Sequence, residues 1–383
     1  MPLQAANIFN KLSEWPHRGA GSEDEMMARE MLTTQLVGEP GVSVAEEGLM
    51  APSTYLPFFW LIALGQAAAI ILAMWLPLVA ILAGAVFFIS HILFFDWRVS
   101  PLIWWMPKRL TANLVAKKGE GRRLIILMAH LDSAPASYAY RADQVKHFAT
   151  SVYVGTGIVG LGVLVPLFDA AGMSAPIWLR ALFALLVLAQ PAIAGLDYWQ
   201  HGYTPGANDN LSGVAAATAA ASQLWRRMPA DAEVRLVITT AEEAGMLGAQ
   251  HYARVHEDEL RARATHVVNF DTVGNKNLKY IHKSGGFTPV YYEGPLLKTA
   301  ESLCNQDKKF SVVKPGVHHV GDFDSVWFTR AGVSTLTIAS YDDEGLMPHI
   351  HTPEDTKAHV DLDQVALSAV FGEALVRLLP PTD

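Results

Sequence analysis

Short motifs of histidine and carboxylate residues lie far apart along this chain, and their residue types suit a metal-dependent hydrolase. Imidazole and carboxylate groups together form a borderline-to-hard ligand set, which suits Zn²⁺ and also accommodates Mn²⁺ or Co²⁺. The motifs supply five potential metal ligands and one further glutamate. The five motifs are His130-Leu131-Asp132, Asn208-Asp209-Asn210, Glu242-Glu243, Asn269-Phe270-Asp271 and His349-Ile350-His351.

Three of these motifs follow runs that have the composition of buried strands, because the runs are short, apolar and rich in β-branched residues. The runs are Leu124–Ala129, Arg235–Thr240 and Thr265–Phe270. In open α/β sheets, ligands bind in the crevice beyond the carboxyl ends of the strands. We therefore expect His130, Glu243 and Asp271 to converge although they are distant in sequence.

A two-metal centre needs one carboxylate that bridges the ions, which lie about 3.5–4 Å apart and together activate a water and polarise a carbonyl. Asp209 is the best candidate, because it lies in a glycine-flanked turn ahead of a helix predicted over Val214–Trp225, with Ser212 as its expected cap. Glu242 and Glu243 should point in different directions, so one can bind metal while the other accepts a proton. The motif itself leaves open which does which.

Asp132 follows His130 by two residues and is expected to accept the second imidazole N–H, which fixes the tautomer. Each motif alone also has an ordinary interpretation, as a surface pair, a solvated face or a turn. Their joint occurrence at strand ends favours catalysis. A thiolate site is excluded, because the single cysteine, Cys304, lies in a polar helix-like stretch and is interpreted as a structural thiol.

The motifs resemble those of the di-zinc aminopeptidases of the bacterial leucyl aminopeptidase and aminopeptidase Y type. The resemblance is loose over Leu3–Val44 and then covers Ala112–Ala139 and Tyr203–Leu378. It implies a peptide substrate and two zinc ions. The matching positions are His130 and Asp271 for one zinc, Glu243 and His351 for the other, Asp209 as the bridge, and Glu242 as the general base.

Two segments depart from the family pattern. The run from Phe323 to Val333 resembles a pocket-shaping Ser-Asp-His-x-x-Phe…Gly segment, of which only the Asp, Phe and Gly are retained. Ile350 stands where many members carry a tyrosine whose phenol helps to polarise the substrate carbonyl. His349 and Tyr341 are the candidates to replace that phenol.

The chain is more apolar than an ordinary soluble enzyme, with 51% hydrophobic residues among 383 and a mean hydropathy of +0.21. Gly48–Phe95 contains no Asp, Glu, Lys or Arg, and two spans of about 20 residues fit within it. His147–Phe168 and Pro176–Gly195 form a second pair. Because globular helices of this length normally show a polar face, we predict two transmembrane hairpins rather than buried core helices. Arg180, near a span end, is expected to reach water.

Both hairpins interrupt an α/β domain with a mixed β-sheet and helices on both faces. Val42–Glu47 and Thr111–Ala116 are expected to be neighbouring strands on either side of the first hairpin, and Met26–Leu36 a helix with acidic residues at its start. The predicted division is residues 1–47 (N-terminal part of the peptidase domain), 48–110 (first hairpin and interfacial segment), 111–146 (peptidase domain), 147–197 (second hairpin) and 198–383 (peptidase domain).

Basic residues gather on one side of the predicted membrane, whereas the far ends of the hairpins have no Lys or Arg. Tryptophans accompany them as an interfacial belt. The residues are Trp97, Arg98, Trp104, Trp105, Lys108, Arg109, Lys117, Lys118, Arg122 and Arg123. Cytoplasmic loops carry excess positive charge, which predicts an integral protein of a bacterial inner membrane with a cytoplasmic catalytic domain. The N-terminal stretch has no h-region, which predicts no cleavable signal peptide.

The predicted function is therefore a membrane-anchored zinc aminopeptidase whose partners are peptides and the lipid bilayer. A net charge of −8 and scattered basic residues give no support for nucleic-acid binding. One alternative is a non-peptidase amidohydrolase or a glutaminyl-cyclase-like enzyme, which would use fewer metals. The other is an inactive membrane scaffold, against which the retention of every ligand argues. The sequence predicts no oligomeric state.

Overall fold

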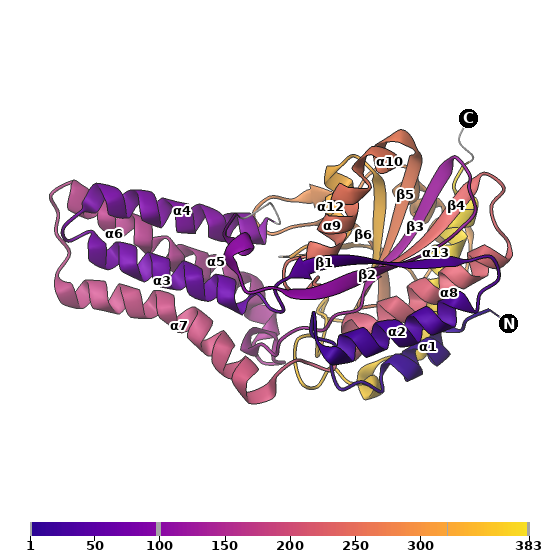
Figure 1. The fold of residues 1–383 in the computed structure, drawn as a ribbon, viewed down its shortest axis with the longest axis horizontal. Helices are drawn as coiled ribbons and strands as arrows, with labels where there is room; N and C mark the ends of the chain where they lie inside the picture. Colours follow the sequence, from indigo (N-terminus) through magenta and orange to yellow (C-terminus); the bar gives the residue numbers. More distant parts are fainter. Residues whose placement is uncertain (1, 97–100, 320, 381–383) are drawn as a thin grey trace.

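The computed structural model describes residues 2–96, 101–319 and 321–380, and its two parts lie end to end (Figure 1). One part is a layered α/β domain. The other is a bundle of long helices that projects from one end of this domain. The predicted belt residues Trp97 and Arg98 lie outside the described residues.

A mixed sheet forms the centre of the α/β domain, with strand order β1-β2-β4-β3-β5-β9-β6-β7 and β8 paired to β6. The strands β4, β3, β5 and β9 run parallel, and the outer strands are antiparallel except β8. The strands are β1 (Ser43–Ala51), β2 (Arg109–Lys118), β3 (Arg123–His130), β4 (Ala232–Thr239), β5 (Ala264–Asp271), β6 (Asn277–Ser284), β7 (Val290–Tyr291), β8 (Lys314–Val317) and β9 (Ser334–Tyr341).

The central strands are buried on both faces, which is why their sequences are continuous apolar runs rather than alternating ones. The three predicted strands correspond to β3, β4 and β5, and the predicted pairing on either side of the first hairpin is that of β1 with β2. β1 continues to Ala51, four residues past the predicted boundary at Glu47. The predicted mixed α/β fold is confirmed.

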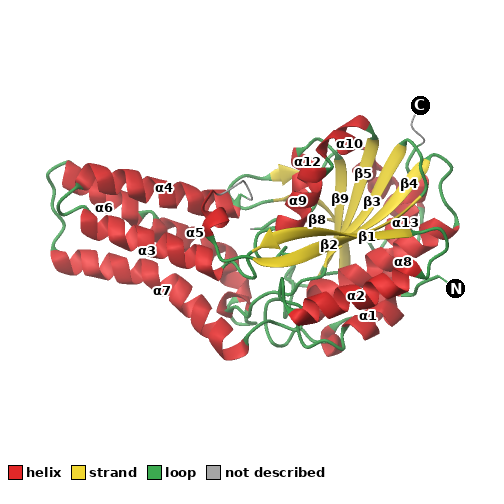
Figure 2. Cartoon of the chain, viewed as in Figure 1, coloured by secondary structure: helices red, strands yellow, loops and turns green. Residues whose placement is uncertain are grey.

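Helices cover both faces of the sheet (Figure 2). Ile125 and Leu127 of β3 point into a core shared with α1, α2, α8, α11 and α13, while Leu124, Ile126 and Met128 pack against α9, α10 and α12. These helices are α1 (Ala5–Leu12), α2 (Glu23–Val37), α8 (Gly213–Arg226), α9 (Leu247–Val255), α10 (Glu257–Ala262), α11 (Pro295–Gln306), α12 (Val326–Arg330) and α13 (Leu362–Leu378). The predicted helices are α2 and α8.

The bundle contains the two apolar regions of the sequence. Its helices are α3 (Leu56–Leu72), α4 (Pro77–Phe95), α5 (Phe148–Val159), α6 (Leu161–Ala170) and α7 (Ile177–His201). The second pair consists of α7 and a bent helix, α5 with α6, which is interrupted at Gly160 and contains Pro166. Among the described residues, three helical stretches are long and apolar enough to cross a membrane, namely Pro77–Phe95, Val145–Ala170 and Ile177–His201.

The expectation of two complete hairpins therefore differs from the structure at α3, which is a shorter apolar helix. The reason is that the uncharged run begins within β1, which uses residues up to Ala51. Arg180 also differs from expectation, because its side chain is buried rather than extended to water. It pairs with Asp169 at 2.5 Å and donates hydrogen bonds to the main-chain oxygens of Ile70 and Ala175, which satisfies the charge inside the bundle.

Candidate active site

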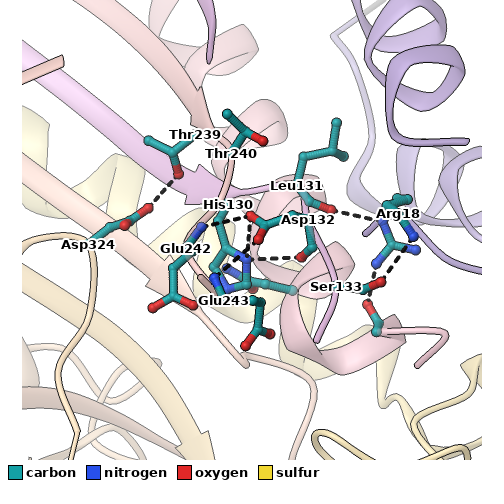
Figure 3. A network of polar contacts seen from close by, with 12 residues as sticks. Arg18, His130, Leu131, Asp132, Ser133, Thr239, Thr240, Glu242, Glu243 and Asp324 are labelled. Atoms are coloured by element: carbon teal, nitrogen blue, oxygen red, sulfur yellow. Dashed lines mark hydrogen bonds and ion pairs between the residues drawn. The ribbon is translucent and has the colours of Figure 1, made fainter. Parts of the chain in front are cut away.

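The candidate ligands meet at the carboxyl ends of the central strands, where the sheet faces the bundle. His130 is the last residue of β3, and Glu242 and Glu243 follow β4 (Figure 3). Asp271 is the last residue of β5. Because parallel strands end at one edge of the sheet, these side chains converge as the sequence predicts. Asp209 reaches the same place from the turn before α8.

Asp209 lies between two imidazoles. Its Oδ1 is 3.2 Å from Nε2 of His130, and its Oδ2 is 3.1 Å from Nε2 of His351. Asp271 Oδ2 is 3.7 Å from His130 Nε2, and Glu243 Oε2 is 3.2 Å from His351 Nε2. The five side chains thus form two ligand-like groups that share Asp209: one with His130 and Asp271, the other with Glu243 and His351.

A third group of ligand-like side chains joins His130 to both Glu242 and Glu243. Glu243 is buried and its Oε1 has no hydrogen-bond partner among the described residues, whereas Glu242 is half-buried and lines the cavity. This difference makes Glu243 the better ligand and leaves Glu242 accessible to substrate.

The turn that carries Asp209 is held by side chains from other parts of the chain. Asp355 accepts hydrogen bonds from the main-chain N–H groups of Asn208 and Asp209, at 2.8 and 3.1 Å. Asn210 donates to the main-chain oxygen of Phe270 at 2.9 Å, which ties the turn to β5. The expected cap at Ser212 is wrong. That residue has helical dihedral angles, and its hydroxyl donates to the oxygen of Asn208 instead.

Arg18 ties the loops after β3 and before α8 together. Its buried guanidinium donates to the main-chain oxygen of Leu131 at 2.9 Å (Figure 3). It also donates to the main-chain oxygens of Pro205 and Gly206, each at 2.8 Å. Neither Arg18 nor Asp355 was identified from the sequence. Both lie in loops without a ligand motif of their own, so their roles depend on tertiary contacts.

Asp132 supports the glutamate pair as well as His130. Its carboxylate accepts hydrogen bonds from the main-chain N–H groups of Glu242 and Glu243, each at 3.1 Å. His130 Nδ1 hydrogen-bonds the main-chain oxygen of Asp132 at 3.1 Å, and the carboxylate oxygen is farther away, at 3.6 Å. The imidazole is therefore oriented by the main chain of Asp132, and the carboxylate positions the start of the next loop.

The electrostatics of the cluster favour a bound cation. Burial raises the pKa of Asp271 to about 7 and raises the pKa of Glu242 and Glu243 well above the usual range. Burial also acts to raise the pKa of Asp209, but hydrogen bonds from His130 and His351 hold it below its usual value. So many buried carboxyl groups, one with an unpartnered oxygen, are a donor set that a divalent ion would neutralise. The residues present fit zinc.

A cavity of about 520 Å³ opens onto the ligands. Tyr140, whose ring lies 4.1 Å from that of His351, lines it together with Phe323, Tyr341 and Ile350. Tyr341 is thus a phenol inside the cavity, whereas His349 stacks on His359 at 4.2 Å. Tyr140 was not identified from the sequence, because its loop comes from the segment ahead of the second apolar region.

Comparison with known proteins confirms the predicted resemblance. Residues 193–371 match the sequence profile of Peptidase family M28. The chain is 31% identical over 170 residues to Aminopeptidase YwaD of Bacillus subtilis, a match that covers 43% of this chain and 35% of that protein. The chain therefore spans about a third of that curated relative. These similarities support the predicted class of enzyme, a metallo-exopeptidase.

Solved structures share the fold at low sequence identity. A Zn-dependent exopeptidase from Parabacteroides distasonis has a TM-score of 0.59 and 14% identity, with 100% of this chain and 99% of that chain covered. A glutaminyl cyclase from Porphyromonas gingivalis has a TM-score of 0.58 and 15% identity, with 98% of each chain covered. At this identity the likeness establishes the fold and leaves the reaction to the residues of the site.

Proposed function

We propose that the chain is a zinc-dependent aminopeptidase, anchored in a membrane, that removes N-terminal residues from peptides. The observation that carries the proposal is the position of Asp209, with one carboxylate oxygen facing each of two imidazoles. A shared carboxylate between two ligand groups is the arrangement that a pair of metal ions requires. The family match and the curated aminopeptidase support the peptidase assignment.

In this proposal, each ligand group would hold one zinc ion and Asp209 would bridge the two. When bound, the ions supply Lewis acidity for the scissile carbonyl and lower the pKa of a water. Glu242 accepts a proton from the attacking water and delivers it to the leaving nitrogen. The water oxygen adds to the carbonyl carbon, the C–N bond breaks, and the products are a free amino acid and a peptide shortened by one residue.

The same carboxylates explain a preference for a free N-terminus. With metal bound, Glu242 would be a carboxylate in the cavity next to the metal ligands, and its negative charge would favour a protonated α-amine over an acylated one. The test is a panel of aminoacyl-anilides and their N-acetylated counterparts. We expect zinc-dependent hydrolysis of the free amines and little hydrolysis of the acetylated compounds.

A glutaminyl-cyclase-like activity is the second candidate, because glutaminyl cyclases share the fold. In that reaction the α-amine attacks the side-chain amide, ammonia leaves, and the peptide bond stays intact. Ammonia release from glutaminyl peptides without anilide cleavage would replace the aminopeptidase proposal with this one. Cleavage of the free aminoacyl-anilides would reject it.

The proposed anchor is the helical bundle, inserted in a bacterial inner membrane with the catalytic domain in the cytoplasm. The three long apolar helices support insertion, and Lys108 and Arg109 at the sheet-domain end support the orientation. A reporter that is active only outside the cytoplasm, fused after Asp383, should be inactive. Strong reporter activity would reverse the orientation, and release of the protein by high salt alone would reject insertion.

A further inference from the structure

The cavity at the candidate ligands continues beyond the α/β domain into the helical bundle. It is lined by the ligand side chains at one end and by residues of α3, α4, α5 and α7 at the other. The bundle residues include Phe59, Ile62, Phe94, Val159 and Val187, which are apolar. One continuous space therefore joins a polar reaction centre to an apolar interior.

The apolar part of the cavity is deep. Ala63 lines it and lies seven residues after Leu56, the first residue of α3, which corresponds to about 10 Å along the helix. Val187 lines it from α7 and belongs with Ala63 to one buried cluster of the bundle. A substrate confined to the ligands would leave this part unused.

Polar groups along the bundle walls are largely satisfied by one another. His91 Nε2 hydrogen-bonds Thr156 Oγ1 at 3.1 Å, and Gln190 Nε2 donates to the main-chain oxygen of Gly155 at 3.3 Å. His91 Nδ1 has no hydrogen-bond partner among the described residues. A water molecule needs two to four polar partners to be held in a cavity, so most of this space is better filled by an apolar group.

We propose that the substrates are amphiphilic aminoacyl amides, with the free amine and scissile amide at the ligands and an extended apolar chain in the bundle. This inference rests on the proposed aminopeptidase function. On the N-terminal side of the scissile bond, the substrate ends at the amine, so an extended chain continues only from the leaving nitrogen. Water adds across the amide C–N bond, giving an amino acid and an amine that carries the apolar chain.

The volume and chemistry of the cavity suit such an occupant. Small-molecule sites of about 300–1,000 Å³ are mostly apolar with a few convergent polar groups, and this cavity, at about 520 Å³, has that composition. Burial of each CH₂ group of the chain is favourable, so chain length should strongly affect reactivity. The apolar chain could come from an alkyl amine or from a hydrophobic peptide, which present the same chemistry to the walls.

The test compares leucyl-methylamide with leucyl-dodecylamide on the full-length, zinc-loaded protein in lipid discs. We expect kcat/KM to be at least tenfold higher for the dodecylamide. A second pair of substrates distinguishes an alkyl amine from a hydrophobic peptide. It consists of a leucyl peptide continued by leucines and a leucyl peptide continued by serines. A preference in the alkyl pair alone assigns an alkyl amine, and a preference in both pairs includes hydrophobic peptides.

Two neighbouring substitutions separate binding in the cavity from simple enrichment of the long-chain substrate in lipid. Ala63→Trp fills the deep end and should reduce the dodecyl-to-methyl ratio at least tenfold. Leu64→Trp, at an exposed position on the outer surface of the same helix, should leave the ratio unchanged. Ile62→Ala enlarges the cavity and should raise the ratio of hexadecylamide to dodecylamide hydrolysis. This variant tests the inference even if Ala63→Trp misfolds.

Equal rates for the short and long amides in the wild-type protein would overturn the inference while leaving the aminopeptidase intact. An equal loss of the ratio in the Ala63 and Leu64 variants, or no change in either, would also overturn it. Failure to hydrolyse any of the amides or peptides with zinc present would instead reject the proposed function.

Discussion

The α/β domain and the helical bundle have opposite distributions of polarity. The domain gathers a cluster of buried carboxylates and histidines at one end of the sheet, around Asp209, and covers its apolar strands with helices. The bundle is mostly apolar inside and outside, and its interior charges, such as Arg180 and Asp169, are paired. Only 17% of the apolar window of α7 is buried, and Trp178 and Leu185 are 66% and 65% exposed. Contiguous apolar surface of this kind marks contact with a membrane or another protein.

The two parts are stabilised in different ways. In the domain, burial of apolar surface from water drives packing. In the bundle, close contact between small residues is prominent: a side chain at Gly84 would collide with the main chain of Gly162, and Gln66 donates a hydrogen bond to the oxygen of Gly84 at 3.0 Å. Small-residue contacts and internal hydrogen bonds are typical of helices that associate in lipid.

The largest expected effect is at the carboxylate shared by the two ligand groups. Asp209→Ala removes the side chain that the two groups share, so bound zinc should fall. The loss of kcat/KM for leucyl-anilide should exceed the about 10–100-fold that follows loss of a residue supporting a metal ligand. Metal analysis and rates are measured together, with the exposed Asp343→Asn as the control. Activity and metal content close to wild type would remove Asp209 from the centre.

The exposed surface of the bundle and that of the α/β domain should respond differently when the same charge is placed on each. Leu185→Asp on α7 should destabilise the protein in lipid discs by about 2.5–3.5 kcal/mol, the cost of a carboxylate at the centre of a membrane span. Val312→Asp, at a comparably exposed site of the α/β domain, should change stability by less than about 0.5 kcal/mol. Equal effects on unfolding would break the comparison.

Substitution of the adjacent glutamates Glu242 and Glu243 should affect different properties of the enzyme. Glu242→Gln cannot accept a proton, so turnover should fall by at least about 10²-fold while zinc content stays near normal. Glu243→Gln should instead lower zinc occupancy. Turnover and zinc content of both variants are the readouts, and exchanged phenotypes would reverse the two roles.

Asp355 acts through the turn that carries Asp209. In Asp355→Asn, the acceptor of two main-chain N–H groups becomes neutral, and zinc affinity should weaken by about 10–100-fold, as for other side chains that orient metal ligands. Competition with a fluorescent chelator measures the affinity. Unchanged affinity would show that the turn is held without this charge.

The smallest expected effect is a pH dependence remote from the site. Despite the opposing effect of burial, hydrogen bonds and charge from Arg235 and Arg263 lower the pKa of Glu259 from 4.5 to about 2. Since the folded pKa is depressed, this stabilisation is present above pH 4.5 and is lost as the pH falls towards 2. Glu259→Gln should therefore flatten the loss of unfolding free energy in that window. An unchanged profile would contradict the assignment.

The positions of the strand ends and of the ligands could be predicted from the sequence. Buried parallel strands are continuous apolar runs, and a ligand-type residue follows each of the three predicted runs. Asp209 could be predicted as a ligand because its turn precedes an Ala-rich helix. Arg18, Asp355 and Tyr140 could not be predicted as site residues. Arg18 and Asp355 lie in loops and Tyr140 ends the short 3-10 helix Tyr138–Tyr140, and tertiary contacts rather than a local pattern bring each of them to the site.

The sequence predicts which regions form the helical bundle, but it predicts the first and last residues of the bundle helices less well. Composition located the apolar regions, but hydropathy alone could not separate the end of β1 at Ala51 from the start of α3. Hydropathy also treated Arg180 as a lone charge, whereas Asp169, from the preceding helix, satisfies it. Pairing across helices is a tertiary property, so a pattern along one helix does not contain it.

If Asp209 is shared by two zinc sites, the metal-free wild-type protein should bind two zinc ions, which a zinc titration measures. We predict binding close to two equivalents per chain, with leucyl-anilide hydrolysis absent after chelation and restored as both equivalents bind. Saturation at one equivalent with full hydrolysis would contradict the bridging role of Asp209.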